Sequence, residues 1–154
     1  MGANRRREMV VEKRTLEAEF IDQREEVVII RDDSPPYLIS RPIPDGRTLK
    51  KVVITTVSKD QGRSSYLEHY CTYRNSWTWF ELSIGSPGSG EKWRGLVAKN
   101  LHAHNCFREH TIERADRVLY ERARSGDVLT VWACAKFPGW ENTVKKVTMR
   151  YVVE

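Results

Sequence analysis

The stretch from Val52 to Val57 consists of six β-branched residues in a row, which restricts this region to one kind of backbone. Val, Ile and Thr lose side-chain freedom in a helix but pack well on a pleated strand. The run is followed by Asp60-Gln61-Gly62, a sequence typical of a turn. We therefore predict a strand that ends close to residue 60.

A second strand is predicted in the segment WTWFEL, beyond a long polar excursion. Because side chains alternate along a strand, neighbouring residues of this segment face opposite ways. One face carries Trp77, Trp79 and Glu81, and the other carries Phe80 and Leu82. A strand with large residues on both faces either lies in the centre of a two-layer β-structure or has rings on its outer surface.

The remaining elements are short and are bounded by Gly, Pro, Asn and Asp. Further strands are predicted at 27–30, 93–104, 107–113, 128–135 and 146–153, with an extended connection at 37–46 and a loop at 85–90. One or two helical turns are predicted in 115–124. Seven or eight strands with at most two short helices predict an all-β fold, a single-domain antiparallel β-sandwich of jelly-roll type.

The chain of 154 residues suits one domain, and its composition of 40% hydrophobic and 31% charged residues is that of a globular protein. Residues 1–25 carry mixed charges, and Leu16, Phe20 and Ile21 could form a narrow helical stripe. We predict an N-terminal arm or short helix at 1–25 and the sandwich at 26–154.

The distribution of charge and the length of the apolar runs exclude some classes of partner. The 26 basic residues are interspersed with 21 acidic ones, so nucleic acid is not predicted as the partner despite the net charge of +5. No apolar run approaches the roughly 20 residues of a membrane span, and no signal-peptide pattern follows the basic start. We predict a cytoplasmic protein without a membrane partner; a nuclear location and the oligomeric state stay open. The three cysteines lack CxxC spacing, which indicates reduced thiols, and Cys134 is expected to be buried.

The histidines suggest one metal site. His102 and His104 are two residues apart, so on a strand both imidazoles would face the same way, and Glu109 and His110 follow closely. This HxH-x4-E spacing resembles the first motif of the cupins, which are metal-binding jelly rolls. The resemblance implies a divalent metal as cofactor. The chain has no histidine after His110, however, and so lacks the second motif of that family.

Aromatic and polar residues gather between the first two predicted strands. Flat rings stack on sugars or cap peptide side chains, and amides, carboxylates and guanidinium groups hydrogen-bond hydroxyls. The turn 137–140 would add a ring if it lies beside this loop. The predicted ligand-binding residues are Asp60, Gln61, Arg63, Tyr73, Arg74, Asn75, Trp77, Trp79 and Trp140.

Complete catalytic motifs are absent from the sequence. There is no G-x-S-x-G, no Walker A and no G-x-G-x-x-G, and the pair His69 and Cys71 lacks an identifiable orienting partner. We therefore expect a protein that binds and does not catalyse, and that needs no cofactor.

The order of features resembles that of the galactose-binding-like β-sandwich superfamily, which includes discoidin-type and F-box-associated domains. An extended lead-in precedes the W-x-W-F strand, Gly126-Asp127 precedes an apolar strand, and a Pro-Gly-Trp turn precedes a final alternating strand. The resemblance implies a recognition domain that binds a ligand in its end loops. We predict a glycan or an extended protein segment as the partner. The alternatives are a cupin-like metalloenzyme and a protein-interaction or self-assembly subunit.

Overall fold

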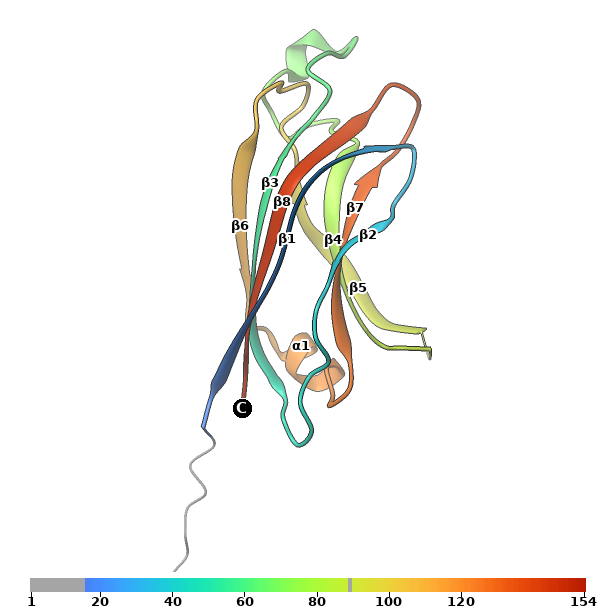
Figure 1. Cartoon of the computed structure of the whole chain (residues 1–154). Helices are drawn as coiled ribbons and strands as arrows, with labels where there is room; N and C mark the ends of the chain where they lie inside the picture. Colours follow the sequence, from blue (N-terminus) through green and yellow to red (C-terminus); the bar gives the residue numbers. More distant parts are fainter. Residues whose placement is uncertain (1–15, 89) are drawn as a thin grey trace, which may run out of the picture.

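The computed structural model describes residues 16–88 and 90–154, which form two antiparallel four-stranded sheets packed face to face (Figure 1). The first sheet contains, in order, β1 (Ala18–Arg31), β8 (Glu141–Val153), β3 (Leu49–Lys59) and β6 (Arg108–Arg114). The second contains β2 (Pro36–Ile39), β7 (Val128–Ala135), β4 (Thr78–Ser86) and β5 (Gly90–Lys99). A 3-10 turn, η1 (Leu67–His69), and a short helix, α1 (Arg117–Arg122), lie in the connections. No helix among the described residues is long and apolar enough to cross a membrane.

The strand order is that of a jelly roll. Only β4 and β5 are both consecutive in the chain and paired in one sheet; every other connection crosses to the opposite sheet. Eight strands in two such sheets are the jelly-roll arrangement. The predicted all-β sandwich of jelly-roll type is confirmed.

The core lies between the two sheets and follows the alternation of the strands. Phe80 and Leu82 of β4 are each 1% exposed, whereas Trp79 and Glu81 lie on the outer face. In the C-terminal half of β8, the alternating residues Val147, Met149, Tyr151 and Val153 are buried. The predicted alternation is confirmed for both strands, and the structure shows that the face of β4 with Phe80 and Leu82 is the inward one.

The prediction of a helix in the N-terminal segment is wrong for its last part, because β1 begins at Ala18. The strand pairs with β8 along its length, and the ring of Phe20 stacks on that of Tyr151 at 5.5 Å between centroids. Pairing with a strand more than a hundred residues away therefore overrides the helical spacing of Leu16, Phe20 and Ile21. Residues 1–15 of the predicted arm lie outside the described residues.

The strand predicted at 93–104 is also shorter, because β5 ends at Lys99. Asn100 is buried, and its side-chain amide donates to Thr78 Oγ1 at 3.0 Å and to Asn142 Oδ1 at 2.9 Å. These bonds fix the chain where it leaves the sheet. His102 and His104 consequently lie in a loop, and the Ala103 between them has a left-handed φ of 52°.

The connections gather at two ends of the sandwich (Figure 1). The loop end is formed by the segments 32–35, 60–77, 100–107 and 136–140. The helix end is formed by α1, the segments 40–48 and 123–127, and the β4–β5 hairpin. Segments 40–48 and 123–127 are joined by hydrogen bonds from Ile43 N to Asp127 O and from Gly126 N to Ile43 O.

Candidate functional site: a pocket at the loop end

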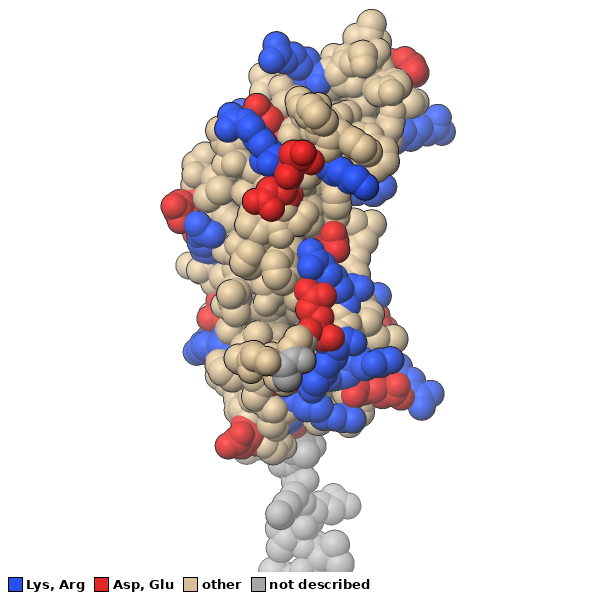
Figure 2. Space-filling model, turned by 90° about the vertical axis from the view of Figure 1, so that its right-hand side faces the viewer, with Lys and Arg blue, Asp and Glu red and all other residues tan. Residues whose placement is uncertain are grey.

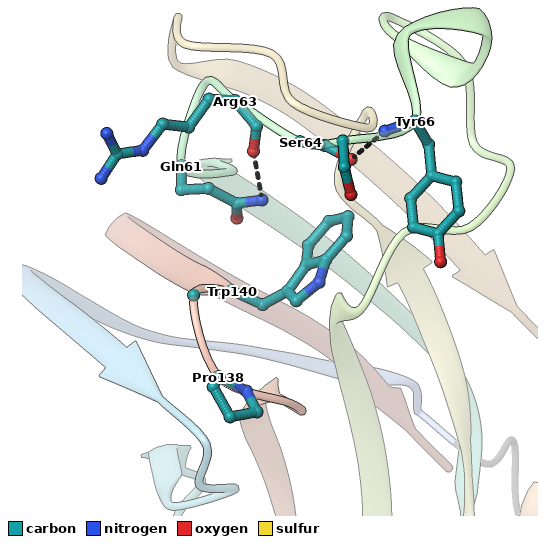
Figure 3. Close-up of a pocket in the computed structure, with 8 residues that line it drawn as sticks. Gln61, Arg63, Ser64, Tyr66, Pro138 and Trp140 are labelled. Carbon is teal, nitrogen blue, oxygen red and sulfur yellow. Dashed lines mark hydrogen bonds between the residues drawn. The ribbon is translucent and has the colours of Figure 1, made fainter.

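A pocket of about 340 Å³ lies at the loop end, between the segment after β3 and the turn that joins β7 to β8 (Figure 3). It is lined by Gln61, Arg63, Ser64, Ser65, Tyr66, Pro138, Gly139 and Trp140. Three predicted ligand residues, Gln61, Arg63 and Trp140, are thus brought together. The turn 137–140 lies beside the 60–75 loop, which is the condition on which the predicted contribution of this turn depends.

The side chain of Gln61 ties the two walls of this pocket together. Its Nε2 donates to the carbonyl of Arg63 at 2.9 Å (Figure 3), and its Oε1 accepts from the backbone N–H of Glu141 at 3.1 Å. Both polar atoms of the amide are therefore engaged within the protein. Gln61 shapes the pocket more than it offers free hydrogen-bonding groups to a ligand.

The segment that carries Ser64 and Tyr66 is held by local hydrogen bonds. The hydroxyl of Tyr70 accepts from Ser64 N at 2.7 Å and donates to Ser64 O at 2.8 Å. Ser64 Oγ accepts from Tyr66 N at 3.0 Å. These bonds fix the backbone of this wall before any ligand arrives, although Tyr66 itself is 46% exposed.

Asp60, predicted to contact ligand, is instead buried beneath the loops with 1% exposure. Its carboxylate accepts from Gln61 N at 2.7 Å and from Ala103 N at 2.9 Å, which joins two loops of the loop end. Burial raises the pKa of Asp60 to about 6, although both backbone N–H groups act to lower it. Its role in this fold is to position Gln61 and the 100–107 segment.

Behind the pocket, an aromatic cluster surrounds the imidazole of His102, which is 0% exposed. The indole of Trp140 lies edge-on to it at 5.0 Å, and three further rings, those of Tyr66, His69 and Tyr70, lie within 6.3 Å. Nδ1 of His102 donates to the carbonyl of Asn75 at 3.0 Å, whereas its Nε2 is buried with no hydrogen-bond partner among the described residues. His102 thus supports the two rings that flank the pocket.

The four predicted metal ligands make separate contacts. His104 Nδ1 lies 3.6 Å from Cys71 Sγ, and His110 Nε2 lies 2.7 Å from the hydroxyl of Tyr73. Glu109 is an exposed residue of β6, and burial, followed by the charge of Arg108, lowers the pKa of His110. Within residues 16–88 and 90–154, no three His, Cys, Asp or Glu side chains form a group able to hold a metal. The strand geometry on which the His102–His104 prediction depends is wrong.

Trp77 and Trp79 lie apart from the pocket, on the outer face of the second sheet. They line a shallow hollow of about 140 Å³ together with Ser76, Leu96 and Lys99. Trp77 also packs edge-on against Phe137 at 4.9 Å, and its Nε1 donates to Asn75 Oδ1 at 3.0 Å. The structure therefore divides the predicted aromatic site into two, with the 137–140 turn contributing to both. Of the other predicted residues, Tyr73 and Arg74 are exposed at the loop end but do not line the pocket.

The rest of that outer face is a network whose polar groups satisfy one another. Glu81 accepts from Trp79 Nε1 at 2.6 Å and from Arg94 Nε at 2.8 Å, and the Arg94 guanidinium lies 4.3 Å over the ring of Trp132. Burial would raise the pKa of Glu81, but these donors outweigh it and lower the pKa. Figure 2, viewed from this side, shows charged side chains of both signs among the uncharged ones. We assign this network a stabilising role.

The predicted set of ligand-binding residues omits five of the eight residues that line the pocket: Ser64, Ser65, Tyr66, Pro138 and Gly139. The available signals were the Ser-Ser-Tyr and Pro-Gly-Trp segments, which combine rings with hydroxyls and a tight turn. Gly139 has a φ of 87°, the left-handed backbone that glycine adopts at no steric cost.

Comparison of this chain with protein-family models, with curated proteins and with solved structures finds no match. The resemblance to the galactose-binding-like superfamily therefore stays a prediction.

Proposed function

We propose that this protein is a non-catalytic recognition domain that binds a glycan in the pocket at its loop end. The observation that carries the proposal is the juxtaposition of the Tyr66 and Trp140 rings with Arg63 and two serine hydroxyls in one preformed hollow. Aromatic rings stack on the apolar faces of sugars, and hydroxyl and guanidinium groups hydrogen-bond their oxygens. At about 340 Å³ the pocket falls at the lower end of the range for small-ligand sites, which suits one or two sugar rings.

Backbone strain at the same end supports the proposal. Within residues 16–88 and 90–154, all five non-glycine residues with a left-handed φ lie in segments of the loop end: Asp32, Cys71, Asn75, Ala103 and Phe137. Such conformations cost free energy and persist mainly where the surrounding structure enforces them, commonly at ligand sites. Strain confined to one end of the sandwich favours that end as the place of binding.

The test compares two tyrosines with equal exposure. Tyr66 lines the pocket and is 46% exposed, whereas Tyr120 lies on α1 at the opposite end and is 47% exposed. We expect Tyr66→Ala to weaken binding to a glycan array by about tenfold or more, and Tyr120→Ala to leave it unchanged. Both variants should melt within a few degrees of the wild type. Equal binding by the two variants, or no binding of any glycan by the wild type, would overturn the proposal.

An extended protein segment is the second candidate ligand. It is favoured by Leu67, which follows Tyr66 and is 72% exposed, since a lone exposed leucine suits a peptide side chain better than a sugar. Leu67→Ser separates the two readings. A glycan ligand predicts unchanged affinity in this variant, whereas a peptide ligand predicts a loss measured with a peptide array.

A further inference from the structure

We infer that the ligand of the loop-end pocket is an acidic glycan, one whose sugar carries a carboxylate as in a uronic acid. The inference rests on the proposed function and adds the class of sugar to it. It follows from the charge and the hydrogen-bonding capacity of the residues that line the pocket.

The pocket has a cation without a counter-ion. Arg63 is exposed, and none of the eight lining residues is acidic. No salt bridge joins Arg63 to any acidic side chain of the described residues. Of the other twelve arginines among the described residues, seven form a salt bridge, as Arg31 does with Glu141 at 3.0 Å, and five do not: Arg47, Arg74, Arg108, Arg122 and Arg124. The guanidinium of Arg63 is thus available to an anion from solution.

Acidic residues adjacent to the pocket in the chain are occupied elsewhere. Glu141, next to Trp140, is bound by Arg31, and Asp60, next to Gln61, is buried against two backbone N–H groups. Asp32 Oδ1 accepts from Phe137 N at 3.3 Å. None of these carboxylates, nor that of the exposed Glu68 in the same loop, forms a salt bridge with Arg63, so the residues that line the pocket carry one positive charge.

The hydrogen-bonding groups that remain free in the pocket are mostly donors. Gln61 Nε2 and Oε1 each make one hydrogen bond within the protein, so one N–H of the amide stays free. The other free donors are the Arg63 guanidinium and the hydroxyls of Ser64 and Ser65, of which Ser64 Oγ already accepts from Tyr66 N. A donor-rich site favours a ligand group that only accepts, and an ionised carboxylate is such a group.

The arrangement of the lining residues matches a ring that bears one charge. Figure 3 shows Gln61 between Arg63 and Trp140, with the Arg63 side chain extending outward at the edge of the pocket. Rotation of this long side chain would bring its planar guanidinium to the carboxylate of a sugar stacked on Trp140, which it would bind with two parallel bonds. With one cation in the pocket, a singly charged group is favoured over a phosphate, which commonly recruits several donors or cations.

The experiment measures affinity by calorimetry for probes that differ only in charge. The pairs are oligogalacturonate with its full methyl ester, and sialyllactose with the methyl ester of its carboxylate; polyglutamate tests for a peptide ligand. The variants are Arg63→Gln and Arg74→Gln. Arg74 is an exposed arginine of the same loop that does not line the pocket, so the two variants change the net charge equally.

We expect at least one acidic sugar to bind about tenfold or more tightly than its neutral partner. Arg63→Gln should abolish this preference and Arg74→Gln should keep it. If the neutral and acidic members of each pair bind equally and Tyr66→Ala weakens both, the charge inference is wrong and glycan binding stands. Equal losses in the two arginine variants also overturn the inference, because they indicate non-specific attraction to a basic protein. If no sugar binds, or if polyglutamate alone binds through Arg63, the proposed function fails with it.

Discussion

Each end of the sandwich buries one aspartate, and the surroundings at the two ends shift the pKa of that aspartate in opposite directions. At the helix end, Asp127 is 0% exposed and accepts from Lys92 Nζ at 2.8 Å, Ser86 Oγ at 2.7 Å and Arg124 N at 2.8 Å. Burial alone would raise the pKa of Asp127, but these donors outweigh it and lower the pKa. At the loop end, Asp60 has two backbone donors and no cation, and its pKa rises to about 6.

The same contrast holds for the backbone. Turns of the helix end that need a left-handed φ place glycine there, as at Gly46 and Gly126. The loop end also uses glycine, at Gly62 and Gly139, but it places Ala103 and Phe137 in that region as well, and it buries an imidazole nitrogen of His102 without a partner among the described residues. A fold that satisfies its polar groups at one end has the means to satisfy them at the other. The unsatisfied groups at the loop end are therefore consistent with selection for binding over stability.

The largest expected effect is on the aspartate of the helix end. Asp127→Ala leaves Lys92, the Ser86 hydroxyl and Arg124 N without their shared acceptor, so we expect a loss of about 3 kcal/mol in the free energy of unfolding, measured with urea. Asp45→Ala removes an exposed acid of the same end and should change the free energy of unfolding by less than about 0.5 kcal/mol. Similar losses in both variants would mean that Asp127 does not organise this end.

The next effect concerns the pH dependence of stability at the loop end. Because the pKa of Asp60 rises from 3.8 to about 6 on folding, the folded state holds a proton that the unfolded state has released between these values. The contribution of Asp60 is therefore fully present below pH 3.8 and is lost as the pH rises through about 6. The asparagine of Asp60→Asn does not ionise, so the variant does not lose this contribution as the pH rises. Its free energy of unfolding should therefore increase relative to that of the wild type by about 1–3 kcal/mol across that window.

Urea unfolding of the wild type and Asp60→Asn in steps from about pH 4 to pH 7 gives this difference directly. Asp127 is present in both proteins, and its contribution, which has the opposite sign because its pKa is lowered, cancels. A difference in the free energy of unfolding that stays constant at all pH values would show that burial does not raise the pKa of Asp60.

A smaller effect separates the two kinds of turn. Gly126 has a φ of 86° and an added Cβ would meet no atom within 4 Å, so Gly126→Ala isolates the backbone cost, about 1 kcal/mol. At Ala103, with its φ of 52°, Ala103→Gly relieves strain but gives the unfolded chain more freedom, for a net gain of about 0.5 kcal/mol. The midpoint of thermal unfolding should fall in Gly126→Ala and rise in Ala103→Gly. A loss of stability in both would refute strain at the loop end.

How far the sequence predicts this molecule depends on whether a pattern is local. Alternation placed Phe80 and Leu82 on the face opposite to Trp79, because a strand enforces period two over a few residues, but only the fold shows that Phe80 and Leu82 face inward. Asp60 looked like an ordinary turn acid; its burial depends on Ala103, which meets it only in the folded chain. Likewise the pocket needs Gln61 and Glu141 to meet across eighty residues of sequence. The residue types of the site were predictable, but the division of its rings between pocket and sheet face was not.

The smallest effect is kinetic and uses the three cysteines as reporters of their surroundings. Burial, aided by the charge of Glu81, raises the pKa of Cys134 to about 11, whereas Cys71 and Cys106 are exposed in the loop end. Iodoacetamide should therefore alkylate native Cys134 most slowly, because the thiolate is the reactive species.

Cys71 Sγ lies 3.6 Å from His104 Nδ1, an imidazole nitrogen that can accept the thiol proton. His104→Gln should then slow alkylation of Cys71 severalfold and leave that of Cys106 unchanged, as followed by peptide mass spectrometry. Equal slowing of both thiols would assign the effect to a general rearrangement of the loops and not to the contact between Cys71 and His104.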